Sequence, residues 1–301
     1  RSLSKARGKL RGIGICNFIE GAGGDSSEFA AIKVSGDNRV QIRTGCLSQG
    51  QGHETSMRQI VGDALGLDPQ CIDMPEADSK ITSQGTGTNA SRSIVRGGSA
   101  LFEAVTILKE KALTFASEIL EVSEQDISYR NGSFLIDGTD RSVSIFDIAR
   151  QRELAAQKFH RNELVTYPNG CQVCEVEVDP ETGETQILSF ITVDDVGRAI
   201  NPMIVHGQSQ GGIVQGIGQA MFEHTIYDRS SGQLHTGSFL DYCIPRADQL
   251  PSIEPISNDC PSPTNLLGVK GAGEGGTTGA PATIMNAISN ALAPAGVSRI
   301  D

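Results

Sequence analysis

Tryptophan is absent from this 301-residue sequence, and aromatic residues make up only 5% of it. Lysine and arginine form no cluster and the net charge is −11, so we expect no groove for the phosphate backbone of a nucleic acid. The sequence also lacks the run of about 18 apolar residues that a membrane-spanning helix requires. We therefore expect a protein that binds neither nucleic acid nor membrane.

Seven cysteines are scattered along the chain, and their odd number and irregular spacing argue against a disulfide framework. Free cysteines are typical of a reducing compartment, so we predict a cytoplasmic protein. Cys171 and Cys174 form a CxxC in a stretch that alternates like a β-strand, which places their side chains on opposite faces. A tetrahedral site would need a second CxxC or a histidine pair, so we expect no metal-ligating residues in this chain.

Glycine is abundant, with 35 residues, and it is densest in the segment GVKGAGEGGTTGAPA at 268–282. This segment places one carboxylate, Glu274, among glycines and is followed by the apolar face of a helix. We expect Thr278 or Gly279 to cap that helix and Pro281 to lie in its first turn. The loop is either a flexible surface turn with a solvated glutamate, or a backbone that a ligand can approach closely because it lacks side chains.

A second polar segment precedes the helical pattern that begins near Met57. Its candidate binding residues are Gln49, Gly50, Gln51, Gly52 and His53. A helix N-terminus favours an anionic or electron-rich ligand, and glutamine side chains offer both donors and acceptors to a heterocycle edge. His53 and Glu54 do not form a zinc-protease HExxH, because the second histidine is missing. The alternative is a capped helix with polar residues in its first turn.

A third segment, residues 79–93, consists almost entirely of hydroxyl, amide and glycine residues and leads into a long helical pattern. Its candidate binding residues are Thr86, Gly87, Thr88, Ser91, Arg92 and Ser93. Hydroxyls, free N–H groups and one arginine at a helix N-terminus suit a phosphate group. The GK[ST] of a Walker loop is missing, and the segment could equally be a polar loop with a helix cap.

A fourth segment, PMIVHGQSQGGIVQGIGQAMFEH at 202–224, predicts a helix with an unusual face. One side is apolar, and the other carries Gln208, Gly212, Gln215 and Gln219. Each glycine costs about 0.5–1 kcal/mol relative to alanine in a helix, so something must compensate. Close helix–helix packing and a flat polar ligand against the helix are the two alternatives.

Each half of the chain shows strands, a Gln- or Gly-rich turn and a helix, which suggests an internal duplication. We predict an α+β fold of two similar mixed α/β subdomains with glycine-rich cofactor-binding turns between strands and helices. The boundary falls before the turn at Tyr167-Pro168. The subdomains are therefore expected at residues 1–165 and 166–301, the second of which carries the Glu274 loop.

Four motifs carry a family resemblance by their order and spacing. They are SQGQGHET (48–55), TGTNASRS (86–93), INPMIVHGQSQGGIVQGIGQA (200–220) and GVKGAGEGGTTGAPA (268–282). Over nearly its whole length the chain resembles the carboxy-terminal molybdopterin-binding half of the large subunit of the xanthine dehydrogenase, aldehyde oxidase and aerobic carbon monoxide dehydrogenase family.

The resemblance implies a role for each motif. Glu274 matches the catalytic glutamate, which acts as a general base, and Gln51 and Gln208 match the glutamines that hold the pterin. Residues 86–93 match the part near the phosphates of a cytosine dinucleotide, and Gly271 and Gly273 belong to the cofactor-binding loop. The implied cofactor is molybdopterin with molybdenum, which needs no protein metal ligand. The implied reaction is hydroxylation of an aldehyde, N-heterocycle or related small molecule with oxygen from water.

The sequence departs from the family pattern in one respect, the absence of a match to an upstream portion. Family members carry a further molybdopterin-binding portion upstream, with a glycine-rich loop and pocket residues that GAGGDSSEFA (21–30) does not match. The expected partners are therefore an upstream molybdopterin-binding domain or subunit, plus subunits carrying [2Fe–2S] clusters and FAD. The alternative is a cofactor-free domain fragment that acts only as an assembly piece. A third hypothesis is an unrelated phosphate-ligand enzyme that uses the glycine-rich turns.

Overall fold

The computed structural model of the chain describes residues 1–24, 26–75, 78–82 and 84–297, so Ser83 of the polar segment 79–93 lies outside the described residues. The chain forms two compact units. Unit 1 comprises Arg1–Gly21, Tyr167–Cys260 and Ala272–Asp301, and unit 2 comprises Ala22–Thr166 and Pro261–Gly271. The chain passes between them at the predicted turn, but the units are not consecutive halves, because the first strand pairs with a strand of the second half.

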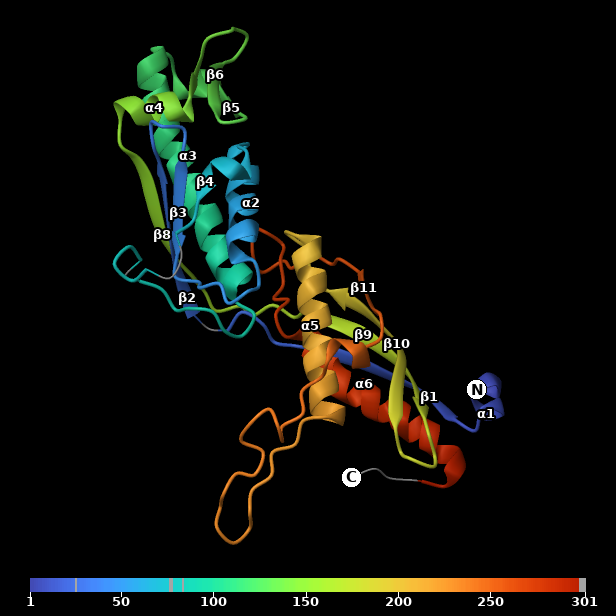
Figure 1. The fold of residues 1–301 in the computed structure, drawn as a ribbon. Helices are drawn as coiled ribbons and strands as arrows, with labels where there is room; N and C mark the ends of the chain where they lie inside the picture. Colours follow the sequence, from blue (N-terminus) through green and yellow to red (C-terminus); the bar gives the residue numbers. More distant parts are fainter. Residues whose placement is uncertain (25, 76–77, 83, 298–301) are drawn as a thin grey trace. The chain divides into compact units, whose positions relative to one another are not determined.

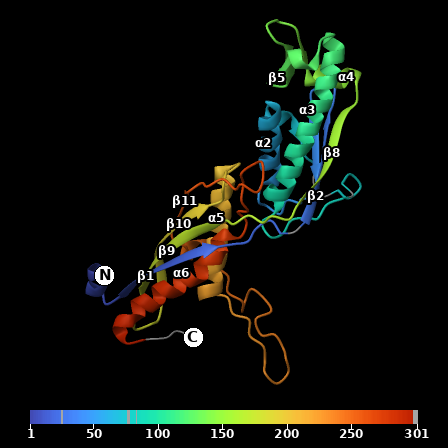
Figure 2. The ribbon, with the colours of Figure 1, turned by 180° about the vertical axis from the view of Figure 1, so that it is seen from behind.

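Unit 1 is built on a four-stranded sheet in the order β1-β9-β10-β11 (Figures 1 and 2). Its strands are β1 (Leu10–Ile19), β9 (Asn169–Val178), β10 (Thr185–Asp195) and β11 (Ile253–Ser257). Its helices are α1 (Ser2–Ala6), α5 (Pro202–Met221) and α6 (Gly275–Leu292), with short 3₁₀ turns η4 (Ala247–Gln249) and η5 (Ala293–Ala295). The pairs β1–β9 and β9–β10 are antiparallel, whereas β10 and β11 are parallel and are joined through α5.

The hydrophobic core of unit 1 lies between one face of this sheet and the helices α5 and α6. Alternate strand residues such as Cys174, Val176 and Phe190 are buried in one cluster with Ile213 of α5 and Ile284 of α6. The intervening residues of each strand point to the opposite face, because side chains alternate along a strand. Both helices therefore lie on the same side of the sheet.

Unit 2 is built on a second four-stranded sheet, in the order β4-β3-β2-β8. The sheet strands are β2 (Ser26–Val34), β3 (Val40–Thr44), β4 (Ile72–Asp73) and β8 (Leu154–Asn162). The helical elements are α2 (His53–Leu65), η1 (Pro69–Cys71), the π-helical turn η2 (Ser93–Gly98), α3 (Ser99–Leu120), η3 (Glu124–Asp126) and α4 (Ile145–Gln151). A separate small sheet contains β5 (Ile127–Arg130), β6 (Ser133–Ile136) and β7 (Ser142–Ser144).

The two units repeat one order of elements. An antiparallel pair (β2–β3 or β9–β10) is followed by a helix (α2 or α5), by a strand parallel to the second (β4 or β11), and by another helix (α3 or α6). An antiparallel edge strand completes each sheet, β8 in unit 2 and β1 in unit 1. The observed fold is therefore mixed α/β with two similar subdomains, as predicted, although β1 comes from the start of the chain.

Glycines allow α5 and α6 to pack closely. A Cβ on Gly212 would lie 2.9 Å from the backbone nitrogen of Thr277, and one on Gly276 would lie 2.4 Å from the carbonyl oxygen of Ser209. Helix–helix packing therefore explains Gly212, which the sequence placed on the same face as the exposed Gln215. It does not explain Gly211, around which an added Cβ would meet nothing within 4 Å.

This difference gives a paired prediction on one helix. Gly212→Ala should lower the free energy of unfolding by about 1–3 kcal/mol, because the backbone of α6 has to move. Gly211→Ala should raise it by about 0.5–1 kcal/mol, because alanine is the better helix former and has free space. Urea unfolding of the purified chain, followed by circular dichroism, measures both. Equal effects of the two substitutions would contradict this account of the packing.

Candidate functional site

Glu274 is the residue at the N-terminal boundary of α6, which begins at Gly275. The backbone N–H groups of Thr277 and Thr278 donate to the carbonyl oxygen of Glu274, at 3.1 and 3.2 Å. The prediction that Thr278 or Gly279 caps this helix was therefore wrong, and Pro281 lies inside the helix. The helix begins earlier because its glycine-rich first turn packs directly against α5. The Glu274 side chain is exposed at this helix end.

The first turn of α6 is fixed to the sheet by Gln172, a residue that the sequence reasoning did not single out. The Gln172 side chain is fully buried, and its Nε2 donates to the carbonyl oxygen of Gly276 at 2.9 Å. A Cβ on Gly279 would lie 2.8 Å from Oε1 of Gln172. The sequence feature that could have indicated this role is a polar residue at an inward-facing position of a strand. Gln172 thus positions the helix end that carries Glu274.

The motif at residues 200–220 lies largely on α5, the helix that packs against α6. Gln208 is half-buried in the second turn of α5. The Asn201 side chain caps α5 by accepting from the backbone N–H of Ile204 at 3.2 Å. Glu274 and Gln208 are therefore carried by two helices in direct contact.

Two aspartates at the end of β10 support this helix, and the sequence reasoning missed them. Asp194 is buried and accepts from the Ser209 hydroxyl of α5 at 2.8 Å. Burial raises the pKa of the Asp194 carboxyl, against the opposing effect of its hydroxyl donors. Asp195 accepts from the backbone N–H groups of Gly197 and Cys260, at 2.9 and 3.1 Å. In the sequence, this role is indicated by two acidic residues at the end of a predicted strand, shortly before the Asn-Pro that begins the next helix.

In unit 2, the Gln/Gly motif forms the turn into α2. Gly50 and Gly52 adopt φ values of 108° and 70°, which glycine tolerates far better than other residues. The backbone N–H of Gln49 donates to the side-chain oxygen of Gln51. His53 is the first residue of α2, and its burial lowers the pKa of the imidazole. Within the described ranges, His53 Nδ1 is a buried polar atom without a hydrogen-bond partner.

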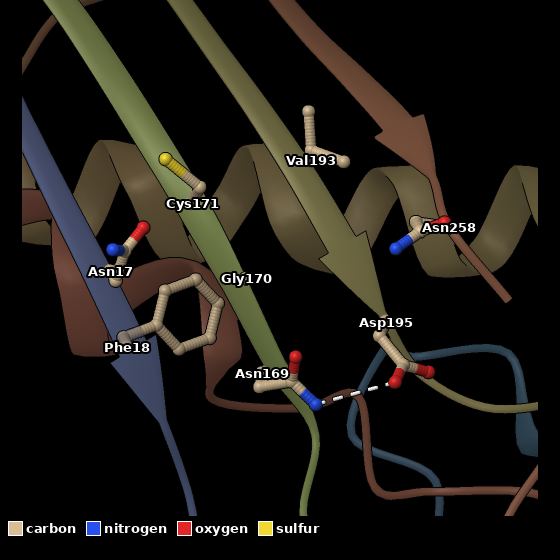
Figure 3. Close-up of a pocket in the computed structure, with 8 residues that line it drawn as sticks. All are labelled: Asn17, Phe18, Asn169, Gly170, Cys171, Val193, Asp195 and Asn258. Carbon is tan, nitrogen blue, oxygen red and sulfur yellow. Dashed lines mark hydrogen bonds between the residues drawn. The ribbon is translucent and has the colours of Figure 1, made fainter. Parts of the chain in front are cut away.

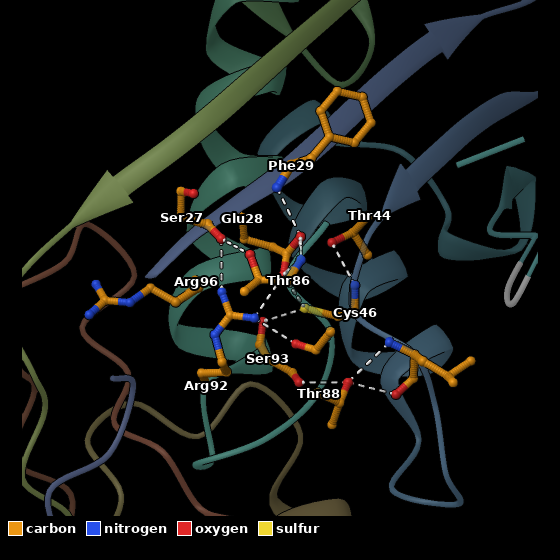
Figure 4. A network of polar contacts seen from close by, with 12 residues as sticks. Ser27, Glu28, Phe29, Thr44, Cys46, Thr86, Thr88, Arg92, Ser93 and Arg96 are labelled. Carbon is orange, nitrogen blue, oxygen red and sulfur yellow. Dashed lines mark hydrogen bonds and ion pairs between the residues drawn. The ribbon is translucent and has the colours of Figure 1, made fainter. Parts of the chain in front are cut away.

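The hydroxyl-rich motif of unit 2 contacts this turn through Thr88 (Figure 4). The Thr88 hydroxyl donates to the carbonyl oxygen of Leu47 at 2.7 Å and accepts from the N–H of Leu47 at 3.0 Å. The Ser93 hydroxyl donates to Thr88 at 3.2 Å. In the fourth motif, a Cβ on Gly271 would lie 2.6 Å from the carbonyl oxygen of Ser91. The structure therefore brings Gly271 and two of the predicted motifs together in this unit.

Arg92 is directed into unit 2 rather than toward the outside. Its side chain is 1% exposed and forms an ion pair with the fully buried Glu28, with an Nη1–Oε2 distance of 2.9 Å (Figure 4). The same guanidinium donates to the carbonyl oxygens of Gly87, at 2.6 Å, and Ser27, at 3.0 Å. The expectation that Arg92 presents its charge to a phosphate therefore does not hold here, because Glu28 holds the guanidinium inside and fixes the loop.

The backbone of this loop is strained. Ala90 and Ser91 have φ values of 46° and 51°, in the left-handed region that non-glycine residues rarely adopt. Each such residue costs on the order of 1–3 kcal/mol and persists only where the surroundings enforce it. A π-helical turn, a feature frequent at functional sites, follows at Ser93–Gly98. Strain, a π-turn and a buried brace together indicate a loop held in one conformation for binding.

The glycines of these motifs leave space where a ligand could lie. An added Cβ would meet nothing within 4 Å at Gly50 and Gly87 in unit 2, or at Gly207 and Gly211 in unit 1. Carboxamides, hydroxyls and bare backbone at helix N-termini suit a large polar ligand with phosphate and heterocycle groups. These residues therefore fit a pterin cofactor.

Two kinds of feature are missing from the described ranges of the chain. Across those ranges, no cluster of three or more histidine, cysteine or acidic side chains is arranged to hold a metal ion. In the same part of the chain, no helix is both long and apolar enough to cross a membrane.

Comparison with known proteins agrees with this architecture. The profile of the molybdopterin cofactor-binding domain matches residues 1–251. The chain is 38% identical to the 6-hydroxypseudooxynicotine dehydrogenase complex subunit gamma of Paenarthrobacter nicotinovorans, over 96% of this chain and 38% of that protein. It is 32% identical to the carbon monoxide dehydrogenase large chain of Hydrogenophaga pseudoflava, over 97% of this chain and 39% of that one.

Among solved structures, quinoline 2-oxidoreductase from Pseudomonas putida 86 superposes with a TM-score of 0.90 and 31% identity, over 99% of this chain and 41% of that one. The fold and the four motifs thus define a molybdopterin cofactor-binding domain. The chain belongs to the molybdopterin cofactor-binding domain family found in the xanthine dehydrogenase and carbon monoxide dehydrogenase large subunits. It spans about two fifths of the length of these relatives.

The inward position of Arg92 can be tested by stability. Arg92→Met should lower the free energy of unfolding by about 3–5 kcal/mol, because it leaves the Glu28 carboxylate buried without a counter-charge. Arg152→Met is the matched control, since Arg152 and its partner Glu118 are both more than half exposed, and it should change stability by less than about 0.5 kcal/mol. Guanidinium chloride unfolding measures both variants. If Arg92→Met lowers the free energy of unfolding by less than about 1 kcal/mol, the ion pair between Arg92 and Glu28 does not stabilise the fold as described.

Proposed function

We propose that this chain provides the molybdopterin-binding surface and the catalytic base of a molybdenum hydroxylase. Its substrate class is an aldehyde, an N-heterocycle or a related small molecule, and the oxygen that it inserts comes from water. The supporting observation is that three of the four motifs have open glycine backbone, at Gly50, Gly87, Gly207 and Gly211, and that the fourth places the exposed Glu274 at the N-terminus of α6. When bound, the cofactor supplies the metal centre that accepts the two electrons of the oxidation.

The binding residues divide by chemistry. The carboxamides of Gln51 and Gln208 can each donate to and accept from the edge of a pterin. The hydroxyls of Thr86, Thr88 and Ser93 donate to oxygen atoms of unit 2 itself, so we assign the phosphates of a cytosine dinucleotide to backbone N–H groups of residues 86–93. Because Arg92 is held inside by Glu28, we assign phosphate binding to those groups and to the α2 and η2 helix N-termini, and not to a guanidinium.

Glu274 acts as the general base in this proposal. Its exposed carboxylate lies at the N-terminus of α6. An ionised carboxylate can accept the proton that leaves the water-derived oxygen as the substrate is oxidised. Gln172 and the glycine contact between α5 and α6 hold the backbone that carries this carboxylate.

We also infer that the working enzyme contains more than this chain. The relatives' chains are about two and a half times as long, so we assign substrate-pocket residues to a further molybdopterin-binding domain or subunit. The [2Fe–2S] clusters and FAD belong to partner chains in this proposal, and the complex is cytoplasmic. Two relatives are named for nicotine and 6-hydroxypseudooxynicotine, which favours nitrogen-containing substrates as the first to assay.

The catalytic role is tested by Glu274→Gln in the assembled enzyme. Molybdenum content should stay near that of the unaltered enzyme, while turnover should fall by about 10²–10⁴-fold, the usual contribution of a general base. Glu181→Gln, an exposed glutamate in the β9–β10 turn, is the matched control and should leave turnover unchanged. Steady-state kinetics measures turnover, and metal analysis of the same preparations measures molybdenum content. Unaltered turnover in Glu274→Gln would remove Glu274 from the reaction.

The glutamines should show the opposite pattern. Gln51→Ala and Gln208→Ala should each weaken retention of the pterin and molybdenum by about fivefold, since a hydrogen bond contributes on the order of 1 kcal/mol. Gln219→Ala, an exposed position three turns further along α5 than Gln208, is the control and should retain both. Metal analysis and pterin fluorescence after dialysis measure retention. Full occupancy in both glutamine variants would contradict their assignment as pterin ligands.

A further inference from the structure

The open face of the sheet in unit 1 carries an apolar patch, which is bordered on the same face by Glu175, Ser189 and Glu254. One row runs across three strands through Ile15, Val173 and Ile191, which face each other in register. The next row is Asn17, Cys171, Val193 and Ile256. Ile13 also points to this face. The exposed fractions of Ile13, Ile15 and Ile256 are 49%, 56% and 49%, so β-branched side chains on both edge strands of this sheet, β1 and β11, lie open.

The second sheet of the same chain shows what a solvated face looks like in this fold. Unit 2 has the same strand order and also covers one face with helices. The outward residues of its strands include the polar residues Lys33, Gln41, Arg43, Gln157 and Arg161, together with Ala31, Ala155 and the paired rings of Phe29 and Phe159. Antiparallel sheets with one face in water normally carry polar residues there. The open face of unit 1 departs from this rule, and the open face of unit 2 largely follows it.

The β1 edge of the unit 1 sheet is protected by side chains of α6. Asn286 of α6 donates to the carbonyl oxygen of Ile15 at 3.1 Å, and the N–H of Ile13 donates to the side chain of Asn290 at 3.1 Å. These side chains occupy backbone groups of β1 that an added strand would need. A partner is therefore expected to pack on the side chains of the face and not to extend the sheet.

A hollow of about 310 Å³ lies at one end of this face (Figure 3). It is lined by Asn17, Phe18, Asn169, Gly170, Cys171, Val193, Asp195 and Asn258. In Figure 3 the helices lie behind the strands, and the side chains of Asn17, Cys171 and Val193 stand on the near side. Carboxamides beside an apolar patch form the combination of anchor pocket and polar rim that is typical of protein interfaces.

From these observations we propose that the open face of the unit 1 sheet is the docking surface for the remaining polypeptide of a large subunit. Solved relatives superpose on 97–99% of this chain, yet this chain covers only 40–41% of theirs. About three fifths of each of those solved chains lies outside the part that this chain matches. An apolar, flat, edge-protected face fits a folded protein surface of this kind. This inference rests on the proposed function, because it assumes a large subunit like those of the relatives.

The test places the photo-crosslinking residue p-benzoylphenylalanine at Ile15, in the complete complex purified from a host that makes all its subunits. Mass spectrometry should find cross-links from this position to large-subunit polypeptide outside residues 1–301. The same substitution at Gln41, on the open face of unit 2, is the matched control and should give none. Cross-links from Ile15 to a second copy of this chain, to an iron–sulfur or flavin subunit, or to nothing would each overturn the proposal.

A pair of double variants measures how much the surface contributes. Ile15→Lys with Ile256→Lys should leave the unfolding midpoint of this chain unchanged but lower its affinity for the remaining large-subunit polypeptide at least 100-fold. Gln41→Lys with Gln157→Lys should preserve that affinity. Unchanged affinity in the isoleucine variant would overturn the proposal, and the cross-link at Ile15 decides the matter if this variant fails to fold. Molybdenum content is read separately: a complex without molybdenum in which Ile15 still cross-links disproves the proposed function and leaves the docking surface standing.

Discussion

The close contact between α5 and α6 determines the geometry of unit 1. It requires glycine on both helices, at Gly212 and Gly276, because any Cβ there would meet backbone atoms of the other helix. The sheet is adapted to the same helix: a Cβ on Gly12 of β1 would lie 2.0 Å from the carbonyl oxygen of Ala287 in α6. The position of Glu274 follows from this packing, since it is the residue at which α6 begins.

Unit 2 stabilises its binding loops by a different device. The buried pair of Glu28 and Arg92 and the hydroxyl of Thr88 hold residues 86–93 in a strained conformation. A buried ion pair adds little net stability over apolar packing, but the loss of one partner is costly. Such a network therefore selects one loop conformation more than it strengthens the fold. The two units differ because they hold different kinds of element. In unit 1 the packing of two helices fixes the end of a helix, whereas in unit 2 hydrogen bonds and an ion pair fix a long loop.

Local patterns predicted what depends on local sequence. Cys171 and Cys174 lie on opposite faces of β9, the first partly exposed and the second buried, as their alternation indicated. The family and the mixed α/β class also followed from motifs. The pairing of β1 with β9 joins residues far apart in the chain, so no local pattern could reveal it. The inward turn of Arg92 depends on a carboxylate 64 positions away, and the early start of α6 depends on its packing against α5.

The glycines on the outer side of α5 show that this chain is adapted to something beyond itself. Gly207 and Gly211 lower the helix stability by about 0.5–1 kcal/mol each relative to alanine. Packing within the described part of the chain does not require them, because an added Cβ at either would meet nothing within 4 Å. Gln208 lies beside them on the same helix. A chain that keeps bare backbone next to a carboxamide, at a cost to its own stability, is shaped for a ligand or polypeptide that approaches the helix closely.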